Sequence, residues 1–351
     1  PDLNVYGWSS PLWGIDTTGT GPVDYSNGFI PSQSGVRGAK AQKVQSSDCE
    51  GKKKGSGDAP QSMGQGMLIT GRPVMIATGT KYLPEMDIAP MGGGVPIGVG
   101  RTYTGGNTKL GAFGQSWSAT FDYTLVFEYE NYVCWAALDK ETSCNPNGKP
   151  LRTVHAYNPS GYATHFYSIN GIWASDYGDT AQLVNGEWVV TYRDGSRYTF
   201  GLNGRPKQIL GERGIGLTYG YNASNQLATI THTSGRSIAL MWSGSKVTGI
   251  TAPNGKFYSY TYDANGFLTS VTYPDNLGTR TYHYEDNFDA GRLTGISING
   301  IRYSRYQYLA DGRAQWSGLE GGIERSNFDY FTDRTVVANA LGQATTYRLT
   351  E

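Results

Sequence analysis

The stretch Tyr258-Ser259-Tyr260-Thr261-Tyr262-Asp263-Ala264-Asn265-Gly266-Phe267-Leu268 decides the fold of this 351-residue chain. Its first three tyrosines alternate with small polar residues, and this period of two is typical of a β-strand that carries its tyrosines on one face. Asn265-Gly266 then supplies residues that tolerate a positive φ, as a tight hairpin turn requires. Leu268 opens a second strand, so the stretch predicts one β-hairpin.

Similar hairpin segments recur throughout residues 213–351. If the residue after each turn is taken as a marker, the markers are spaced 20, 21, 25, 21 and 22 residues apart. A repeat period near 20 residues indicates an array of equal supersecondary units, each stacked on its neighbours. We therefore predict an all-β fold of about six stacked hairpins, and no window of the chain is typical of an amphipathic helix with caps. The markers are Leu227, Val247, Leu268, Leu293, Ala314 and Val336.

The composition agrees with this prediction. The chain contains 49 glycines and 26 tyrosines, which suit turns and half-buried pleated surfaces, and only 17% of its residues are charged. Its 29 basic and 29 acidic residues cancel, which argues against nucleic acid as the main partner because phosphate binding needs a surplus of Lys and Arg. No run of about 18 apolar residues occurs, so we expect no membrane span.

The sequence divides into four parts. Residues 1–33 form an aromatic-rich segment without sustained periodicity, and residues 34–66 form a linker rich in Gly, Ser and Lys that nearly lacks large apolar side chains. A β module is predicted over 67–212 and the repeat array over 213–351. The sequence ends inside the last predicted strand, which we expect to leave an unpaired edge. Whether residues 1–66 plug a structure formed by the rest or form a mobile tail stays open.

The three cysteines leave two possibilities open. Cys134 and Cys144 flank a segment that suits a hairpin tip, where they form either a disulfide, which would imply an oxidising compartment, or two free thiols. Cys49 lies in a polar stretch and is expected to be a free thiol. No CxxC motif and no Cys/His cluster occurs, so we predict neither a metal site nor a cofactor.

No catalytic residues are predicted. The four histidines are scattered without an HExxH motif, and no GxSxG motif is present. The glycine-rich segment 92–100 lacks the Lys-Ser/Thr pair of a phosphate-binding loop. A glycosidase would need two carboxylates at roughly 5–9.5 Å, and the sequence offers no candidate pair.

The segment 262–268 resembles the YD repeat of the Rhs (rearrangement hot spot) proteins. Gly71-Arg72-Pro73-Val74-Met75-Ile76-Ala77-Thr78-Gly79-Thr80-Lys81, Arg101-Thr102-Tyr103 and the segment 110–117 resemble the module that precedes those repeats. The resemblance covers about 72–127 and 188–350. The residues that carry the repeat signature are Tyr262, Asp263, Gly266, Leu268, Tyr284, Gly291, Leu293, Tyr308 and Gly312.

This resemblance implies a β-sheet strip that spirals into a hollow shell, which in polymorphic bacterial toxins encloses a toxic C-terminal domain. It also implies a secreted or cell-surface protein, whose signal segment is absent or already removed because the chain starts at Pro1 without one. The implied partners are the remainder of a longer Rhs polypeptide or a second shell chain, and the enclosed toxin domain. The self-cleaving D-P-x-G-L motif of that family does not occur here.

Related repeat arrays serve adhesion, which gives an alternative interpretation. In that case the chain is an extracellular adhesion or carbohydrate-binding module, and surface glycans are its partners. The alternative requires several aromatic rings exposed in one groove. Its candidate residues are Tyr258, Tyr260, Tyr282 and Tyr306.

Overall fold

The computed structural model describes residues 73–107, 110–140 and 148–350, and the short strands β1 (Trp13–Ile15), β2 (Pro22–Asp24), β3 (Lys40–Lys43) and β4 (Ile69–Thr70). Within these residues no α-helix occurs, and the one helical turn is the 3₁₀ element η1 (Glu320–Gly322). The predicted all-β fold is confirmed.

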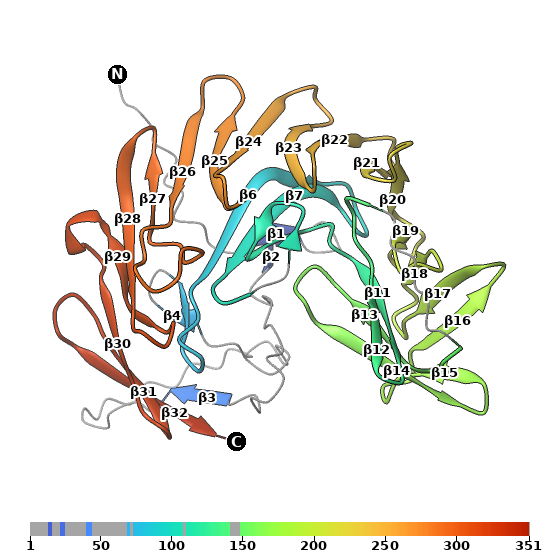
Figure 1. Ribbon diagram of the computed structural model, residues 1–351, viewed down its shortest axis with the longest axis horizontal. Coiled ribbons are helices and arrows are strands. Elements are labelled where there is room, and N and C mark those ends of the chain that lie inside the picture. Colours follow the sequence, from blue (N-terminus) through green and yellow to red (C-terminus); the bar gives the residue numbers. More distant parts are fainter. Residues whose placement is uncertain are drawn as a thin grey trace, which may run out of the picture.

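Most of the chain forms one 23-stranded antiparallel sheet, made of β11 to β32 together with β3. From β13 onward each strand pairs with the next strand along the chain, so the sheet is a row of hairpins that bends into an arc (Figure 1). The strands are β11 (Thr124–Tyr129), β12 (Tyr132–Trp135), β13 (Leu151–Tyr157), β14 (Ala163–Ile169), β15 (Ile172–Ala174), β16 (Thr180–Val184), β17 (Glu187–Thr191), β18 (Arg197–Phe200), β19 (Pro206–Leu210), β20 (Gly216–Tyr221), β21 (Leu227–His232), β22 (Ser237–Ser243), β23 (Lys246–Thr251), β24 (Phe257–Tyr262), β25 (Leu268–Tyr273), β26 (Gly278–His283), β27 (Gly295–Ile298), β28 (Ile301–Tyr308), β29 (Ala314–Leu319), β30 (Ser326–Tyr330), β31 (Arg334–Ala338) and β32 (Ala344–Thr350).

A smaller unit, residues 73–123, lies on the concave side of this arc (Figure 1). We call it the inner module. Its β6–β7 hairpin runs along the arc, and β10 pairs with β7. The strands of the inner module are β5 (Val74–Met75), β6 (Tyr82–Met91), β7 (Ile97–Thr104), β8 (Leu110–Gly111), β9 (Gly114–Gln115) and β10 (Trp117–Ala119).

The turn after each tyrosine-rich strand explains the Asp of the repeat motif. The Asp263 carboxylate accepts a hydrogen bond from the Phe267 amide at 2.9 Å, and its backbone carbonyl accepts one from the Gly266 amide at 3.0 Å. Gly266 has φ +84°, and of the pair 265–266 only the glycine takes a positive φ. The turn is therefore specified by a side-chain acceptor at its start and a glycine near its end.

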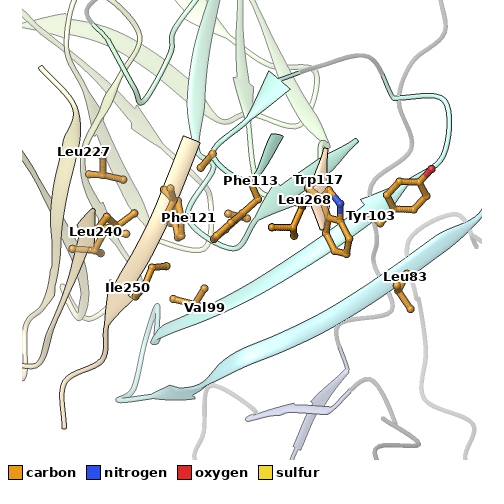
Figure 2. Close-up of a cluster of buried hydrophobic side chains, with 14 of the residues drawn as sticks. Leu83, Val99, Tyr103, Phe113, Trp117, Phe121, Leu227, Leu240, Ile250 and Leu268 are labelled. Carbon is orange, nitrogen blue, oxygen red and sulfur yellow. The ribbon is translucent and has the colours of Figure 1, made fainter. Parts of the chain in front are cut away.

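The marker residues form a continuous core. Five of the six are fully buried, and Figure 2 shows two of them, Leu227 and Leu268, in one cluster with Phe113 of the inner module. The sixth marker, Val336, is wrong by one residue. Thr335 is fully buried and pairs with Tyr330, whereas Val336 faces the other side of β31. Strand alternation reverses the face at each residue, so a degenerate repeat is easily misaligned by one.

The last strand is not left with an unpaired edge, which corrects the expectation from the sequence. Lys40–Lys43 forms β3, and β3 pairs antiparallel with β32. These four residues lie within the predicted linker 34–66, whose sequence has no alternation of apolar residues that would predict a strand. The other residues of 1–66, apart from β1 and β2, lie outside the described residues. The sheet also runs without interruption across residues 212 and 213, where the array was predicted to begin, because β19 pairs with β20.

Candidate functional site

The surface where the inner module meets the concave face of the sheet is the candidate functional site. Here residues that precede the repeat array in the sequence form hydrogen bonds with the marker residues of the repeats. The Val247 amide donates to the Ala112 carbonyl at 2.8 Å, and the Ala314 amide donates to the Gly79 carbonyl at 2.8 Å. The Leu293 amide donates to the Tyr103 hydroxyl at 3.0 Å. Because buried amides need partners, the inner module completes the hydrogen bonding of the array.

Just beyond the inner module, residues 136–140 make a contact of the same kind. The Leu227 amide donates to the Leu138 carbonyl at 2.8 Å. Arg205 also donates to the Leu138 carbonyl, at 3.0 Å, and to the Asn225 carbonyl. The contact between the sheet and the preceding chain therefore extends from Gly79 to Leu138.

Four charged side chains meet at the centre of this surface: Glu85, Asp87, Arg101 and Arg280. We call them the junction cluster. Arg101 binds Asp87 with both Nε, at 2.5 Å, and Nη2, at 2.8 Å, and neither side chain has any exposed surface. Glu85 forms an ion pair with Arg280 of β26. The cluster carries two acidic and two basic groups, so its formal charges cancel inside the protein.

Tyrosines of the array bind the same carboxylate. Tyr260 donates to Asp87 at 2.9 Å and Tyr273 donates to it at 3.1 Å, while the Tyr282 hydroxyl accepts from Arg101 at 2.9 Å. Burial raises the pKa of both Tyr260 and Tyr282, so the hydroxyls stay protonated at neutral pH. Asp87 is therefore held by donors from both the inner module and the repeats.

Arg101 lies within a cage of aromatic rings. Its guanidinium carbon is 5.0 Å from the ring centre of Trp117, and 5.5 to 5.6 Å from those of Phe113, Tyr260 and Tyr282. Its Nη1 is buried without a hydrogen-bond acceptor. Ring faces are electron-rich and attract a desolvated cation, so they take the place of the missing acceptor.

A second set of contacts joins neighbouring repeats at five places along the array. The last aromatic residue of the first strand, here called the anchor, donates to the carbonyl of the marker residue of the preceding repeat, or of Pro206, which holds the marker position of its hairpin. Tyr262 binds the Val247 carbonyl at 2.6 Å, and the two residues are 15 positions apart. The same contact links Tyr221 to Pro206, Trp242 to Leu227, Tyr308 to Leu293 and Tyr330 to Ala314, at 2.5 to 2.9 Å.

In several repeats the residue before the marker position packs against the following anchor position. Arg205 lies 3.9 Å from the ring centre of Tyr221, and Arg313 lies 4.5 Å from that of Tyr330. Phe267 takes this position in its repeat and stacks on Tyr284 at 5.3 Å. Sequence reasoning missed this pairing, although the signal, a basic or aromatic residue 16 or 17 positions before the anchor, is present in the sequence.

The predicted signature residues serve these contacts. Tyr262 and Tyr308 are anchors, and Leu268 and Leu293 are buried markers. Tyr284 holds the anchor position of its repeat, but its hydroxyl accepts a hydrogen bond from Trp117 Nε1 of the inner module at 3.1 Å. Gly312 lies in a turn with φ +91°. Gly291 does not take a positive φ; its role is close packing, because a Cβ there would lie 2.9 Å from the Phe267 ring.

The exposed aromatic surface expected for the adhesion alternative is not formed by its candidate residues. Tyr260, Tyr282 and Tyr306 are buried, and Tyr258 is half-buried. They occupy the face of the sheet that the inner module covers, where Lys81 Nζ lies 3.7 Å from the ring centre of Tyr306. These side chains face the core of the protein and are not available to a glycan.

The structure supports a disulfide without identifying both ends. Cys134 is buried and disulfide-bonded. Cys144 and Cys49 lie outside the described residues, so the pairing of Cys134 with Cys144 stays a prediction.

Two histidines that are separate in the sequence are neighbours in the sheet. His155 and His165 pair across β13 and β14, their Nδ1 atoms are 2.6 Å apart, and His155 Nε2 lies 3.1 Å from Glu128. Burial, followed by the neighbouring His155, lowers the pKa of His165. Across the described ranges no group of three or more His, Cys, Asp and Glu side chains is placed to hold a metal ion. The same residues contain no helix long and apolar enough to cross a membrane.

Two family models match the chain. The "Domain of unknown function (DUF6531)" matches residues 71–143, which include the inner module, and the "RHS Repeat" matches residues 244–277 in the middle of the array.

Curated relatives are much longer than this chain. The chain is 23% identical over 288 residues to the probable deoxyribonuclease RhsA of Dickeya dadantii (strain 3937). This match covers 78% of this chain and 18% of the relative. It is 32% identical over 123 residues to the probable deoxyribonuclease RhsB of the same organism, over 33% of this chain and 8% of the relative. The chain thus spans less than a fifth of the length of either.

Among solved structures, a chain of the Photorhabdus luminescens Tc holotoxin pore is similar at 13% sequence identity, with a TM-score of 0.34. The similarity covers 72% of this chain and 15% of that one.

Proposed function

We propose that this chain, which belongs to the Rhs/YD-repeat family, is a non-enzymatic segment of the wall of a protein shell that encloses a toxic cargo. The observation that carries the proposal is the sealed contact between the inner module and the concave face of a single continuous sheet. A wall must resist local opening, because its purpose is to keep proteases and water-borne partners away from what lies behind it.

The contacts of the array suit such a wall. A strip of hairpins is quasi-one-dimensional, so each repeat is stabilised only by its neighbours and by what covers its face. Anchors such as Tyr262 couple neighbouring repeats, and hydrogen bonds such as that from Val247 to Ala112 fasten the array to the inner module. Both kinds of contact recur along the sheet, so no repeat depends on a single bond.

The cargo and the catalysis are assigned to other parts of the polypeptide. The relatives in Dickeya dadantii bear names that describe deoxyribonucleases, and more than four fifths of their length lies outside the region this chain matches. We assign no catalytic role to the present chain and place any toxic activity in those other parts. Secretion or display at the cell surface follows from the same proposal, as does partnership with the rest of a longer polypeptide or with a second shell chain.

Limited proteolysis of the complete polypeptide that carries this chain tests the proposal. We expect the cargo region to survive trypsin while the shell is folded and to be digested at once after the shell is unfolded in guanidinium. The matched control is the cargo region expressed alone. If that region is digested equally fast inside the intact polypeptide and alone, the chain does not enclose it.

The adhesion alternative is weakened because three of its four candidate tyrosines are buried. Exposed aromatic residues do occur on the first strands, where Trp135 and Tyr167 are about half exposed. A glycan array probed with the folded chain discriminates the two functions. Specific binding that is lost on substitution of Trp135→Ala would favour adhesion, and its absence would favour the wall.

A further inference from the structure

One margin of the repeat sheet carries a periodic row of exposed apolar side chains. In an antiparallel row of hairpins, every second turn lies at the same margin. At this margin, each of the five turns between β23 and β32 carries, within it or directly after it, one large apolar side chain with 45–84% of its surface exposed. We call this row the apolar rim; it consists of Phe257, Leu277, Ile301, Ile323 and Leu341.

The apolar rim begins where the cover provided by the inner module ends. The two preceding turns at the same margin, 211–215 and 233–236, are closed by the tip of the β6–β7 hairpin. Val95 donates to the Ile215 carbonyl at 3.2 Å, and His232 Nε2 lies 3.0 Å from the Gly93 carbonyl. These two covered turns carry none of the large apolar side chains that the structure leaves exposed.

The opposite margin of the same strands is different. There the turn residue Phe267 is buried, and the turn 309–313 packs against Gly79 of the inner module. Among the strands β23–β32, the exposed large apolar side chains at that margin are the isolated Phe288 and Phe331. Scattered exposed apolar residues are normal on a soluble protein, but a row with the period of the repeat indicates a contact surface.

We propose that the apolar rim is a docking surface for a second YD-repeat array, presented by another copy of this chain. The inference rests on the proposed function as a wall segment and names the partner of that wall. Neighbouring strands lie about 4.8 Å apart, so turns at one margin recur about every 10 Å and five of them span about 40 Å. A partner built from the same repeat presents apolar side chains at the same interval, so the two rows match along their whole length.

The charge and the area of the rim agree with this partner. The chain has 29 basic and 29 acidic residues, so two copies do not repel each other through net charge. Five side chains exposed to this degree offer roughly 500 Å² per copy, or about 1,000 Å² in total, which is near the lower limit of a specific interface. The contact is therefore expected to form in the micromolar range and not at nanomolar concentration.

Sedimentation of the chain up to about 100 µM tests the proposal. We expect the wild-type chain to dimerise and the variant Leu277→Asn/Ile301→Asn/Ile323→Asn to dimerise at least ten-fold more weakly. The matched control, Val184→Asn/Leu202→Asn/Phe288→Asn, removes three exposed apolar side chains from the opposite margin and is expected to dimerise like the wild type.

Equal urea midpoints for all three proteins show that the substitutions act on association and not on folding. The proposal is overturned if the wild-type chain stays monomeric to about 100 µM, or if the control loses association as strongly as the rim variant. Neither result bears on the protection of cargo from trypsin, so this inference and the proposed function fail separately.

Discussion

Substitution of Asp87→Asn is predicted to destabilise the chain strongly, because it leaves the Arg101 guanidinium buried without its counter-charge. Asp87 accepts two hydrogen bonds from Arg101 and one each from Tyr260 and Tyr273. Burial alone would lower the pKa of Arg101, but Asp87 and the neighbouring hydroxyl of Tyr282 raise it well above its usual value. Asp87→Asn removes the main cause of that rise, but an arginine guanidinium is not deprotonated in proteins, so Arg101 stays charged and loses its counter-charge.

The expected cost is about 3–5 kcal/mol, the range measured when one partner of a buried ion pair is removed. Two bonds from a charged donor, each contributing roughly 1.5–3 kcal/mol, give a similar figure. A domain has only about 5–15 kcal/mol of stability in total, so the variant should unfold at a markedly lower urea concentration. Trp117 lies in the aromatic cage and is one of eight tryptophans, so loss of the junction contributes to the change in tryptophan fluorescence on unfolding.

The double variant Asp87→Leu/Arg101→Met separates the ion pair from the packing. Because it removes both charges and keeps apolar volume, it is expected to regain part of the lost stability; the hydroxyls of Tyr260 and Tyr273 lose their acceptor, which keeps the recovery incomplete. Asp311→Asn is the surface control: the carboxylate of Asp311 pairs with Arg313 in an exposed turn, where a pair contributes less than about 1 kcal/mol. The reasoning is refuted if Asp87→Asn costs no more than Asp311→Asn, or if the double variant is as unstable as Asp87→Asn.

Three further predictions concern the repeats, the histidine pair and the disulfide. Tyr262→Phe should cost about 0.5–1.5 kcal/mol in urea unfolding, because it removes the hydroxyl that couples neighbouring repeats, whereas Tyr177→Phe at an exposed turn should cost nothing measurable. The lowered pKa of His165 means that its contribution to stability is present above its ordinary pKa of 6.5 and is lost as the pH falls through the lower pKa of the folded state. The urea midpoint should therefore fall less between pH 7.5 and pH 5.5 in His165→Gln than in the wild type, and an equal fall in both would contradict the assignment. Non-reducing peptide mapping should recover one linked peptide that contains Cys134 and Cys144, and a different partner for Cys134 would show that the predicted pairing is wrong.

The period of the repeats could be predicted from the sequence because one physical rule governs it. Alternating apolar residues show which face of a strand is buried, and Gly266 shows where the chain turns. Both signals are local, and both recur in nearly every copy of the repeat. The rule fails at Val336, where the copy is degenerate and the buried position is one residue earlier.

The contacts of the inner module could not be predicted in the same way, because they join residues far apart in the sequence. Glu85 and Arg280 are 195 positions apart, and nothing local in either segment marks them as partners. Charged side chains are normally exposed, so the sequence alone predicts that Glu85 and Arg280 lie at the surface, whereas both are largely buried. β3 was missed for a related reason: Lys40–Lys43 is a strand only because β32 offers it an edge.

The repeats pose a problem of register that the junction cluster solves. Every hairpin presents a similar apolar face at a similar interval, so hydrophobic contact alone would let the inner module bind one repeat earlier or later. The residue four positions before the anchor is Arg280 in the repeat that faces Glu85. In the neighbouring repeats that position holds Tyr258 and Ser304.

A slip by one repeat would therefore bury Glu85 without its ion-pair partner Arg280. Burial already raises the pKa of Glu85, and in the observed register Arg280 and Arg101 offset part of that effect. Without Arg280 the carboxylate must either lose its charge or bear a desolvation cost of several kcal/mol, whereas the apolar contacts would change little. The buried ion pairs thus add little to the stability of the correct register but penalise every other one, which explains why charged residues lie at the centre of a junction that apolar side chains could fill. Arg280→Tyr, which copies the preceding repeat at this position, should consequently lower the cooperativity of unfolding as well as its midpoint, because alternative registers then compete with the native one.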